Sequence, residues 1–306
     1  MSRTSPKPIR YIDILTDVGF KVVFGSEPNK DLLIHFLNEI FKGHKQITDI
    51  QYYKTEFPGL GEHEGGVIFD LLCTGDNGEK FLLEVQRAKQ EFFIQRSVSY
   101  VSRLISDQIP KGKRNEWRYG IKEVYFIAIL ETFSVVSDPD DRLYLRSANI
   151  RFCETNKVFY EGLKFIFLEL VNFVKEINEL NSDLDNWLYV LKNMSRLDKL
   201  PLFSRKPVFQ KLFKISEYSN LTTEEREMYD ISMRHKWDYD NTIDYAKKVA
   251  REEARKEALE EGREEGREEI IRQLIFKTQM TDQQIADISG TEVDIIKSIR
   301  KKLNDK

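Results

Sequence analysis

The sequence predicts an α/β protein with an αβββαβ core followed by a helical C-terminal region. Residues 29–42 and 91–109 carry apolar side chains at the three- and four-residue spacing of amphipathic helices. Between them, short runs rich in valine, isoleucine, leucine and phenylalanine, separated by Gly-Asp-Asn-Gly, are typical of a β-hairpin. From residue 239 onward, a long and highly charged stretch indicates a solvent-exposed helix.

The core elements follow one another along the first 130 residues. A short helical turn is predicted to end at Gly25, and Asn29 is a suitable N-cap for the next helix. Pro110 ends the helix after the hairpin, because proline lacks the N–H that a helix interior requires. The expected elements are helices 17–24 and 29–42, strands 47–54, 66–73 and 80–87, helix 91–109 and strand 123–130.

The remainder of the chain is predicted to be mainly helical. The expected elements are strands 143–153 and 164–170, helices from residue 183 and over 207–235, a charged helix over 239–275, and two short helices over 281–302 that Gly290 separates. We therefore expect three parts: an α/β domain over residues 1–200, a helical connector over 201–240, and a long charged helix with a helix-turn-helix-like end over 241–306.

Composition limits the class of protein. The 306 residues include 48 Lys and Arg against 51 Asp and Glu, a net charge of −3, so the basic balance common in nucleic-acid binders is missing. No run approaches the ~20 apolar residues that cross a bilayer, and the basic start lacks the apolar run of a secretory signal. Cys73 and Cys153 form no CxxC pair. We expect a soluble, cytoplasmic protein with no membrane contact, disulfide scaffold or zinc finger.

The turn of the predicted hairpin decides which side chains share a face. A two-residue Asn-Gly turn would place Asp70 and Glu84 on opposite faces, because successive side chains of a strand alternate. A three-residue loop over 76–78, with its glycine in the left-handed conformation, places Asp70 opposite Glu84 and leaves Gln86 on the same face. The residue types favour the three-residue loop, because it gives the two acids a shared role.

Two acids at opposite positions of a hairpin predict a metal site. Their Cβ atoms would lie about 4.5–5.5 Å apart, and two bare charges at ~5 Å with an effective dielectric near 20 repel by roughly 3 kcal/mol. Mg²⁺, or alternatively Mn²⁺, would relieve this repulsion, since it takes carboxylate and main-chain oxygens and lowers the pKa of a bound water. The expected ligands are Asp70, Glu84 and the Val85 carbonyl. The alternative is that both acids emerge at strand ends into solvent.

A series of motifs along the chain resembles one nuclease superfamily. The motifs are Thr16 to Gly25, Phe69-Asp70, Leu83-Glu84-Val85-Gln86, Gln95-Arg96 with Tyr100, Lys111-Gly112 before Tyr119, Gly-Arg-Glu-Glu-Gly at 262–266, and Thr281 to Ala286. An Asp, 13 intervening residues and then Glu-x-Gln on a hairpin, within an αβββαβ order, resemble the restriction-endonuclease-like PD-(D/E)XK fold. Within that superfamily the chain is most similar to the recombination-promoting nuclease and putative transposase branch.

This resemblance implies a metal-dependent DNA endonuclease, that is, an Mg²⁺-dependent endodeoxyribonuclease with its nuclease-like domain in residues 1–200. It implies that Asp70, Glu84 and Gln86 form the catalytic site, with Gln86 orienting the hydrolytic water. The superfamily signature has Lys where this chain has Gln86, and glutamine can donate hydrogen bonds but carries no charge. Lys21 and Lys89 are the candidates for the missing cation.

The elements beside the hairpin supply further candidates. By resemblance, Asp17 is an additional metal ligand from the first helix; the alternative is a helix-start carboxylate favoured by the macrodipole. Arg96, Tyr100 and Arg103 follow one another at i, i+4 and i+7 and so share one helix face. Such a face would contact phosphates or stack on a base of DNA, or else form a solvated stripe.

A compact basic loop follows that helix. Lys111 and Lys113 in this loop suit contact with DNA phosphates, although most basic loops are simply solvated. DNA is therefore the partner that we expect.

The charged helix carries small residues at every fourth position, namely Ala246, Ala250, Ala254, Ala258, Gly262 and Gly266. A ridge of this spacing can interdigitate with a second helix, so we expect a homo-oligomer through residues 240–275, with a solvated spacer as the alternative. The rival function is a catalytically decayed DNA-binding or regulatory protein that assembles through its C-terminal helices. A helical scaffold protein would require that the hairpin itself is wrongly predicted.

Overall fold

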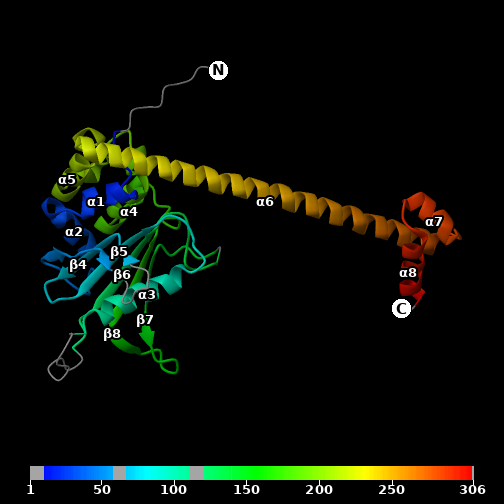
Figure 1. Ribbon diagram of the computed structural model, residues 1–306, viewed down its shortest axis with the longest axis horizontal. Coiled ribbons are helices and arrows are strands. Elements are labelled where there is room, and N and C mark those ends of the chain that lie inside the picture. Colours follow the sequence, from blue (N-terminus) through cyan, green and yellow to red (C-terminus); the bar gives the residue numbers. More distant parts are fainter. Residues whose placement is uncertain (1–9, 58–66, 110–119, 139, 305–306) are drawn as a thin grey trace, which may run out of the picture. The chain divides into compact units, whose positions relative to one another are not determined.

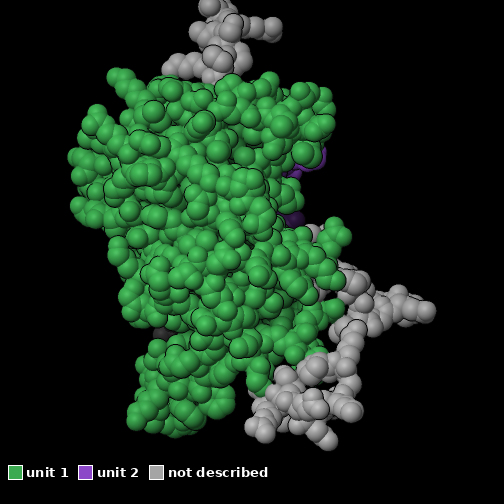
Figure 2. All heavy atoms as spheres, turned by 90° about the vertical axis from the view of Figure 1, so that its left-hand side faces the viewer, with its two compact units in different colours: residues 1–234 green, residues 235–306 purple. Residues whose placement is uncertain are grey.

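The computed structural model describes residues 10–57, 67–109, 120–138 and 140–304. The chain divides into two compact units, unit 1 over Met1–Arg234 and unit 2 over His235–Lys306 (Figures 1 and 2). Within the described ranges, we find no helix with the length and apolarity that a bilayer crossing requires.

A six-stranded mixed sheet forms the centre of unit 1 (Figure 1). Its strands are β1 (Ile50–Tyr52), β4 (Leu71–Gly75), β5 (Lys80–Gln86), β6 (Val124–Leu130), β7 (Leu145–Arg151) and β8 (Val158–Glu169). Their spatial order is β1-β4-β5-β6-β8-β7, in which β5, β6 and β8 are parallel and the other neighbours are antiparallel. A separate antiparallel pair consists of β2 (Glu56–Phe57) and β3 (Val67–Ile68).

Helices cover both faces of the sheet (Figure 1). One face carries α1 (Asp17–Phe24), α2 (Lys30–Ile40), α4 (Asp183–Asn193) and α5 (Pro207–Ile215), and the other carries α3 (Phe93–Ser106). The described 3₁₀ turns are η1 (Glu27–Asn29), η3 (Ile177–Glu179), η4 (Met194–Arg196), η5 (Leu202–Arg205) and η6 (Tyr218–Asn220). The order α2-β1-β4-β5-α3-β6 is the predicted αβββαβ core, so the predicted fold class is confirmed.

The β5 strand separates two apolar cores. Phe81 and Leu83 point into the core beneath α1, α2, α4 and α5, whereas Leu82 points into the core beneath α3. This alternation follows from the two-residue period of a strand. Glu84 and Gln86 share the parity of Leu82 and therefore face α3.

The β4–β5 hairpin has the register predicted from its loop. Leu71 pairs with Leu83, and the pairing continues without a shift toward the turn. The Gly75 N–H donates to the Glu79 carbonyl at 2.9 Å, which encloses a three-residue loop. The third loop residue, Gly78, has φ +83° in the left-handed region that glycine tolerates.

The first strand of the hairpin is interrupted at Asp70. The predicted strand over 66–73 is divided into β3 and β4, and β3 pairs with β2 outside the main sheet. The chain bends where the two pairings meet, so Asp70 lies just before β4 and not within a strand. The predicted strand over 47–54 is also shorter, since β1 begins only at Ile50.

The long charged helix begins earlier than the predicted residue 239. Helix α6 runs over Thr223–Lys277 and has 55 residues. No proline or glycine interrupts it before Gly262. Its first turns are held on unit 1 because Tyr229 is fully buried in a cluster with Ile12 and Leu221.

Of the expected connector over residues 201–240, the part up to Arg234 is grouped with the sheet in unit 1. Phe209, Leu212 and Phe213 of α5 lie in the same core as the sheet. The division between the units, after Arg234, falls inside α6.

Unit 2 contains the rest of α6 together with α7 (Asp282–Ser289) and α8 (Val293–Asn304). Thr281 caps α7 by accepting the N–H of Gln284, and Gly290 ends it with φ +62°. The predicted pair of short helices separated at Gly290 is thus observed. The core of this unit consists of Ile271, Ile285, Ala286, Ile296 and Ile299.

Candidate active site

Asp70 and Glu84 meet where the β4–β5 ladder ends. The last regular pair is Leu71 with Leu83. The next position on each strand, moving away from the turn, is one of the two acids, Asp70 or Glu84. The main-chain N–H of Asp70 donates to Glu84 Oε1 at 3.4 Å. The N–H of Val85 donates to Asp70 Oδ2 at 2.7 Å, so this carboxylate takes the place of a main-chain acceptor. Side chains thereby extend the hairpin beyond its last backbone pair.

The surroundings of both carboxyl groups disfavour the charged form and raise their pKa values. Burial raises the pKa of Glu84, and the charge of Asp70 raises it further. Burial also raises the pKa of Asp70; the Val85 N–H opposes this shift, while the charge of Asp17 adds to it. The Glu84 side chain is only 8% exposed. Glu84 is buried and Asp70 half-buried, and the charge of one carboxylate raises the pKa of the other, so a cation at this site would be favourable.

The Val85 carbonyl points to the same edge of β5 as Asp70. The neighbouring Gln86 carbonyl accepts the N–H of Glu131, which follows β6, at 3.0 Å. Main-chain groups of successive strand residues point to opposite edges, so those of Val85 point away from β6 and past the end of β4. Two carboxylates and one main-chain carbonyl form an all-oxygen donor set, which is what Mg²⁺ and Mn²⁺ prefer.

Gln86 is buried beside the acids and engaged at both ends of its amide. Arg96 donates to Gln86 Oε1 at 2.5 Å, and Gln86 Nε2 donates to the Ala88 carbonyl at 2.9 Å. The Gln86 side chain is 9% exposed. This residue therefore lies where the sequence places it, but its amide is bound to protein groups.

The first helix brings a carboxylate and an ammonium toward the acids. Asp17 forms an ion pair with Lys21 one turn later at 3.0 Å, and both side chains are exposed. The charge of Asp17 raises the pKa of Asp70, and that of Lys21 lowers it, so both side chains lie within electrostatic reach of Asp70. Lys89, the other cation expected at the site, donates to Ser137 Oγ at 3.2 Å.

Helix α3 presents part of its predicted face to the site. The Tyr100 ring contacts Phe69 edge-on with 5.1 Å between centroids, and burial together with the charge of Glu84 raises the pKa of Tyr100. Arg103 lies further along and forms an ion pair with Asp107 at 3.3 Å. Lys111 and Lys113 lie outside the described residues.

A second group of potential ligands, which sequence reasoning missed, lies between α2 and the start of α4. Single ligand atoms of His35, Glu39 and Asp183 lie within 4.8 Å of one another and by distance could hold an ion. In the sequence, only the i,i+4 spacing of His35 and Glu39 could have indicated this group. Asp183 comes from α4, which is distant in the sequence. However, the Trp187 indole N–H donates to His35 Nδ1 at 2.9 Å. In the neutral ring the proton is then on Nε2, so neither nitrogen has a lone pair free for a metal. Lys206 also forms an ion pair with Asp183 at 2.5 Å.

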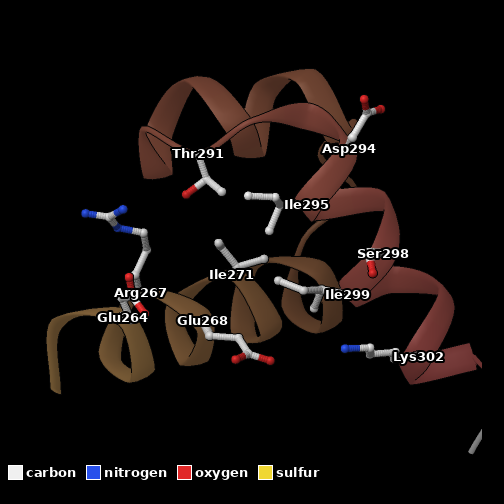
Figure 3. A pocket seen from close by; sticks show the side chains of 10 residues that line it. All are labelled: Glu264, Arg267, Glu268, Ile271, Thr291, Asp294, Ile295, Ser298, Ile299 and Lys302. Carbon is white, nitrogen blue, oxygen red and sulfur yellow. The ribbon is translucent and has the colours of Figure 1, made fainter. Parts of the chain in front are cut away.

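Unit 2 contains a cavity of about 550 Å³ between α6 and α8 (Figure 3). Ile271, Ile295 and Ile299 line its floor and point toward one another, and charged residues of both signs form its rim. Of the basic residues on α8, Lys297 pairs with Asp294 at 3.1 Å. The mixed charge of this cavity contrasts with the paired acids of unit 1.

Comparison with known proteins agrees with the geometry of the hairpin. No curated protein and no solved structure matches the chain. The sequence model of the PD-(D/E)XK nuclease family transposase matches residues 14–246, a span that includes every predicted site residue from Asp17 to Lys113. The family supports a nuclease or transposase kind of function. The resemblance predicted from the motifs is thus confirmed, and the chain belongs to the PD-(D/E)XK nuclease family transposases.

Proposed function

We propose that the protein is a metal-dependent DNA endonuclease of the recombination-promoting type, with its active site at Asp70 and Glu84. The observation that carries this proposal is the contact of the buried Glu84 with the half-buried Asp70 at the end of the β4–β5 ladder. Two neighbouring carboxylates that repel each other, one of them buried, lower the stability of the fold, so the arrangement is better explained by ligand binding than by packing. Family membership agrees with this chemistry.

The donor set supports Mg²⁺ as the resident cation, with Mn²⁺ as a substitute. Asp70, Glu84 and the Val85 carbonyl would hold it, and Asp17, whose charge acts on Asp70, is the candidate for a further ligand. Such an ion supplies a water of lowered pKa and neutralises charge on a phosphodiester. The protein's own contribution is to hold the two carboxylates rigidly: β5 fixes Glu84, and the Val85 N–H fixes the Asp70 carboxylate.

DNA would approach across α3. Arg96 and Tyr100 lie beside the acids, and Arg103 extends the same helix face. Arginine on such a face contacts backbone phosphates without reading bases, and a half-buried tyrosine can stack on an unpaired base. Cys73 and Cys153 are free thiols, which agrees with a reducing, cytoplasmic location.

Plasmid cleavage tests the proposal. Supercoiled DNA is incubated with the full chain and Mg²⁺, Mn²⁺ or EDTA, and nicked and linear products are measured. We expect cleavage with either metal, none with EDTA, and none with Asp70→Ala under any condition. Glu91→Gln, which changes an exposed acid just after the hairpin, is the matched control and should cleave like the wild type. Metal-independent cleavage, or full activity of Asp70→Ala, would contradict the assignment.

The rival function is a DNA-binding or regulatory protein whose site has lost catalysis. It is favoured by the uncharged Gln86 at the signature lysine position and by the exposure of α6. Every side chain between residues 250 and 267 is exposed, including Leu259 at 56%. Assembly through residues 240–275 would cover this surface. Light scattering of the full chain tests it: an oligomer that Leu259→Glu dissociates supports assembly, and a monomer at high concentration contradicts it.

A further inference from the structure

The contacts of Gln86 show how its amide is used. Its oxygen accepts a hydrogen bond from the Arg96 guanidinium, and its nitrogen donates to the Ala88 carbonyl. Arg96 also donates to the side-chain oxygen of Gln90. The side-chain oxygens of Gln86, at the end of β5, and of Gln90, in the following loop, thus both hold the guanidinium. The Oε1 atom of Gln86 is therefore turned toward Arg96.

Arg96 reaches the face of β5 that Glu84 and Gln86 share, since it is hydrogen-bonded to Gln86 there. Burial raises the pKa of Asp70 and of Glu84, and the charge of Arg96 lowers both. Lys21 acts on Asp70 from α1, but it is exposed and paired with Asp17. A guanidinium offers five N–H donors and no acceptor, so Arg96 can supply positive charge and hydrogen bonds but not a base.

Aromatic rings on α3 hold the same guanidinium. Its Cζ lies 5.7 Å from the ring centroid of Phe93 and 5.9 Å from that of Tyr100, both within the range of a cation–π contact. Phe93 is buried in the core beneath α3, so this side of the contact is rigid. A charge held by two oxygens and two rings is pre-organised, which is the condition under which electrostatic stabilisation of a transition state is strong.

We propose that Arg96 is the catalytic cation of this site and that Gln86 is a positioning residue that holds it. This inference rests on the proposed endonuclease function. It replaces the expected role of Gln86, that of orienting the hydrolytic water, and the expected cations Lys21 and Lys89. In this arrangement the guanidinium contacts a non-bridging oxygen of the scissile phosphate and stabilises the negative charge that grows there during hydrolysis. The positive charge comes from α3 and not from β5.

A double-mutant cycle tests the two roles. Cleavage of a saturating duplex is measured for Arg96→Ala, Gln86→Ala and the double variant. We expect Arg96→Ala to lower kcat by about 10²–10³-fold, as removal of one pre-organised donor does elsewhere. Gln86→Ala should lower kcat less than Arg96→Ala does. In the double variant the Gln86 substitution should have no further effect, since Gln86 acts through Arg96. If Gln86 oriented the water itself, the two losses would multiply.

Two measurements separate this role from simple DNA binding and from misfolding. Affinity for a labelled duplex in EDTA should fall only a few-fold in Arg96→Ala, so the loss appears in kcat and not in KM. Affinity for Mn²⁺ by calorimetry, which needs no activity, should increase in Arg96→Ala, because a positive charge that acts on both carboxylates has been removed. Arg196→Ala, which changes an exposed arginine after α4, is the control and should alter neither quantity.

The outcomes distinguish this inference from the proposed function. Wild-type cleavage with an equally active Arg96→Ala overturns the role of Arg96 and leaves the endonuclease in place. Losses that multiply overturn the positioning role of Gln86. A wild-type protein that binds Mn²⁺ but cleaves no DNA overturns the proposed function and the catalytic role together.

Discussion

Asp13 and Tyr229 lie 216 residues apart in the sequence and are joined by a hydrogen bond. The main-chain N–H of Asp13 donates to the phenol oxygen of Tyr229 at 2.7 Å. Tyr229 is fully buried, and burial raises the pKa of its hydroxyl, which therefore stays protonated. This contact fastens the start of α6 to the first segment of unit 1.

Tyr229→Phe removes the acceptor and leaves the Asp13 N–H without this partner. We expect the free energy of unfolding to fall by about 1–3 kcal/mol, the cost of an unsatisfied buried donor. Urea denaturation at pH 7 measures it. Tyr245→Phe, on the same helix but 71% exposed, is the control and should change stability by less than about 0.5 kcal/mol. Equal effects of the two substitutions would contradict the role of the bond.

Asp185 makes stability depend on pH. Burial alone would raise the pKa of this carboxyl, but hydrogen bonds from Lys175 at 2.8 Å and from the Asn181 N–H at 2.9 Å lower it. A folded pKa below the unfolded value of about 3.9 gives stability that is present above that value. The same stability is lost as the pH falls through the folded pKa.

Asp185→Asn should therefore lower the unfolding free energy by about 1–3 kcal/mol at pH 7. Between about pH 4 and pH 2 the variant should lose stability less steeply than the wild type. Urea unfolding over this range measures both slopes, and parallel slopes would show that Asp185 is not responsible.

Two glycines should respond oppositely to alanine. Gly78 has φ +83°, where a Cβ costs about 1–2 kcal/mol, so Gly78→Ala should destabilise the hairpin by that amount. Gly262 lies in the middle of α6, and a Cβ added there meets no described atom within 4 Å. Gly262→Ala should increase the helix content and the stability of α6 by about 1 kcal/mol. Thermal unfolding followed by circular dichroism distinguishes the signs, and the same sign for both would be inconsistent with these backbone conformations.

Asp70→Asn tests whether the acid pair is built for a cation. The amide oxygen can still accept the Val85 N–H, while the repulsion between the acids disappears. Without metal, we expect the melting temperature to equal or exceed that of the wild type. Saturating Mg²⁺ should stabilise the wild type, by about 2.7 kcal/mol at 100 times Kd, and should leave Asp70→Asn unchanged. An equal Mg²⁺ shift in both proteins would place the bound ion elsewhere.

Local chemistry explains what the sequence predicts correctly. The Asp-Asn-Gly loop carries the left-handed glycine that a three-residue turn requires, so the register of the hairpin could be derived from residues 70–86 alone. Gly290 likewise marks the break between α7 and α8. The periodic apolar positions of α2 and α3 are also a local signal, so these two helices could be predicted from their own residues.

Contacts between distant residues explain what the sequence could not predict. The bend at Asp70 exists because β3 pairs with β2, and two-residue strands have no periodicity to read. The early start of α6 depends on the burial of Tyr229 against Ile12. In the site, the face of α3 was predicted, but the direction of Arg96 toward Gln86 follows from how α3 packs on β5.

The bond between Asp70 and Val85 has a consequence for how such a protein changes over evolutionary time. Because this acid also completes the hydrogen bonding of the sheet, replacing it with most other side chains removes one hydrogen bond of the hairpin along with the chemistry. Asparagine is the exception, since its carbonyl oxygen can take over the bond. A single Asp-to-Asn substitution at residue 70 would therefore remove the metal-binding carboxylate and keep the hydrogen bond of the hairpin. By this one change, an enzyme would become a binding protein during evolution.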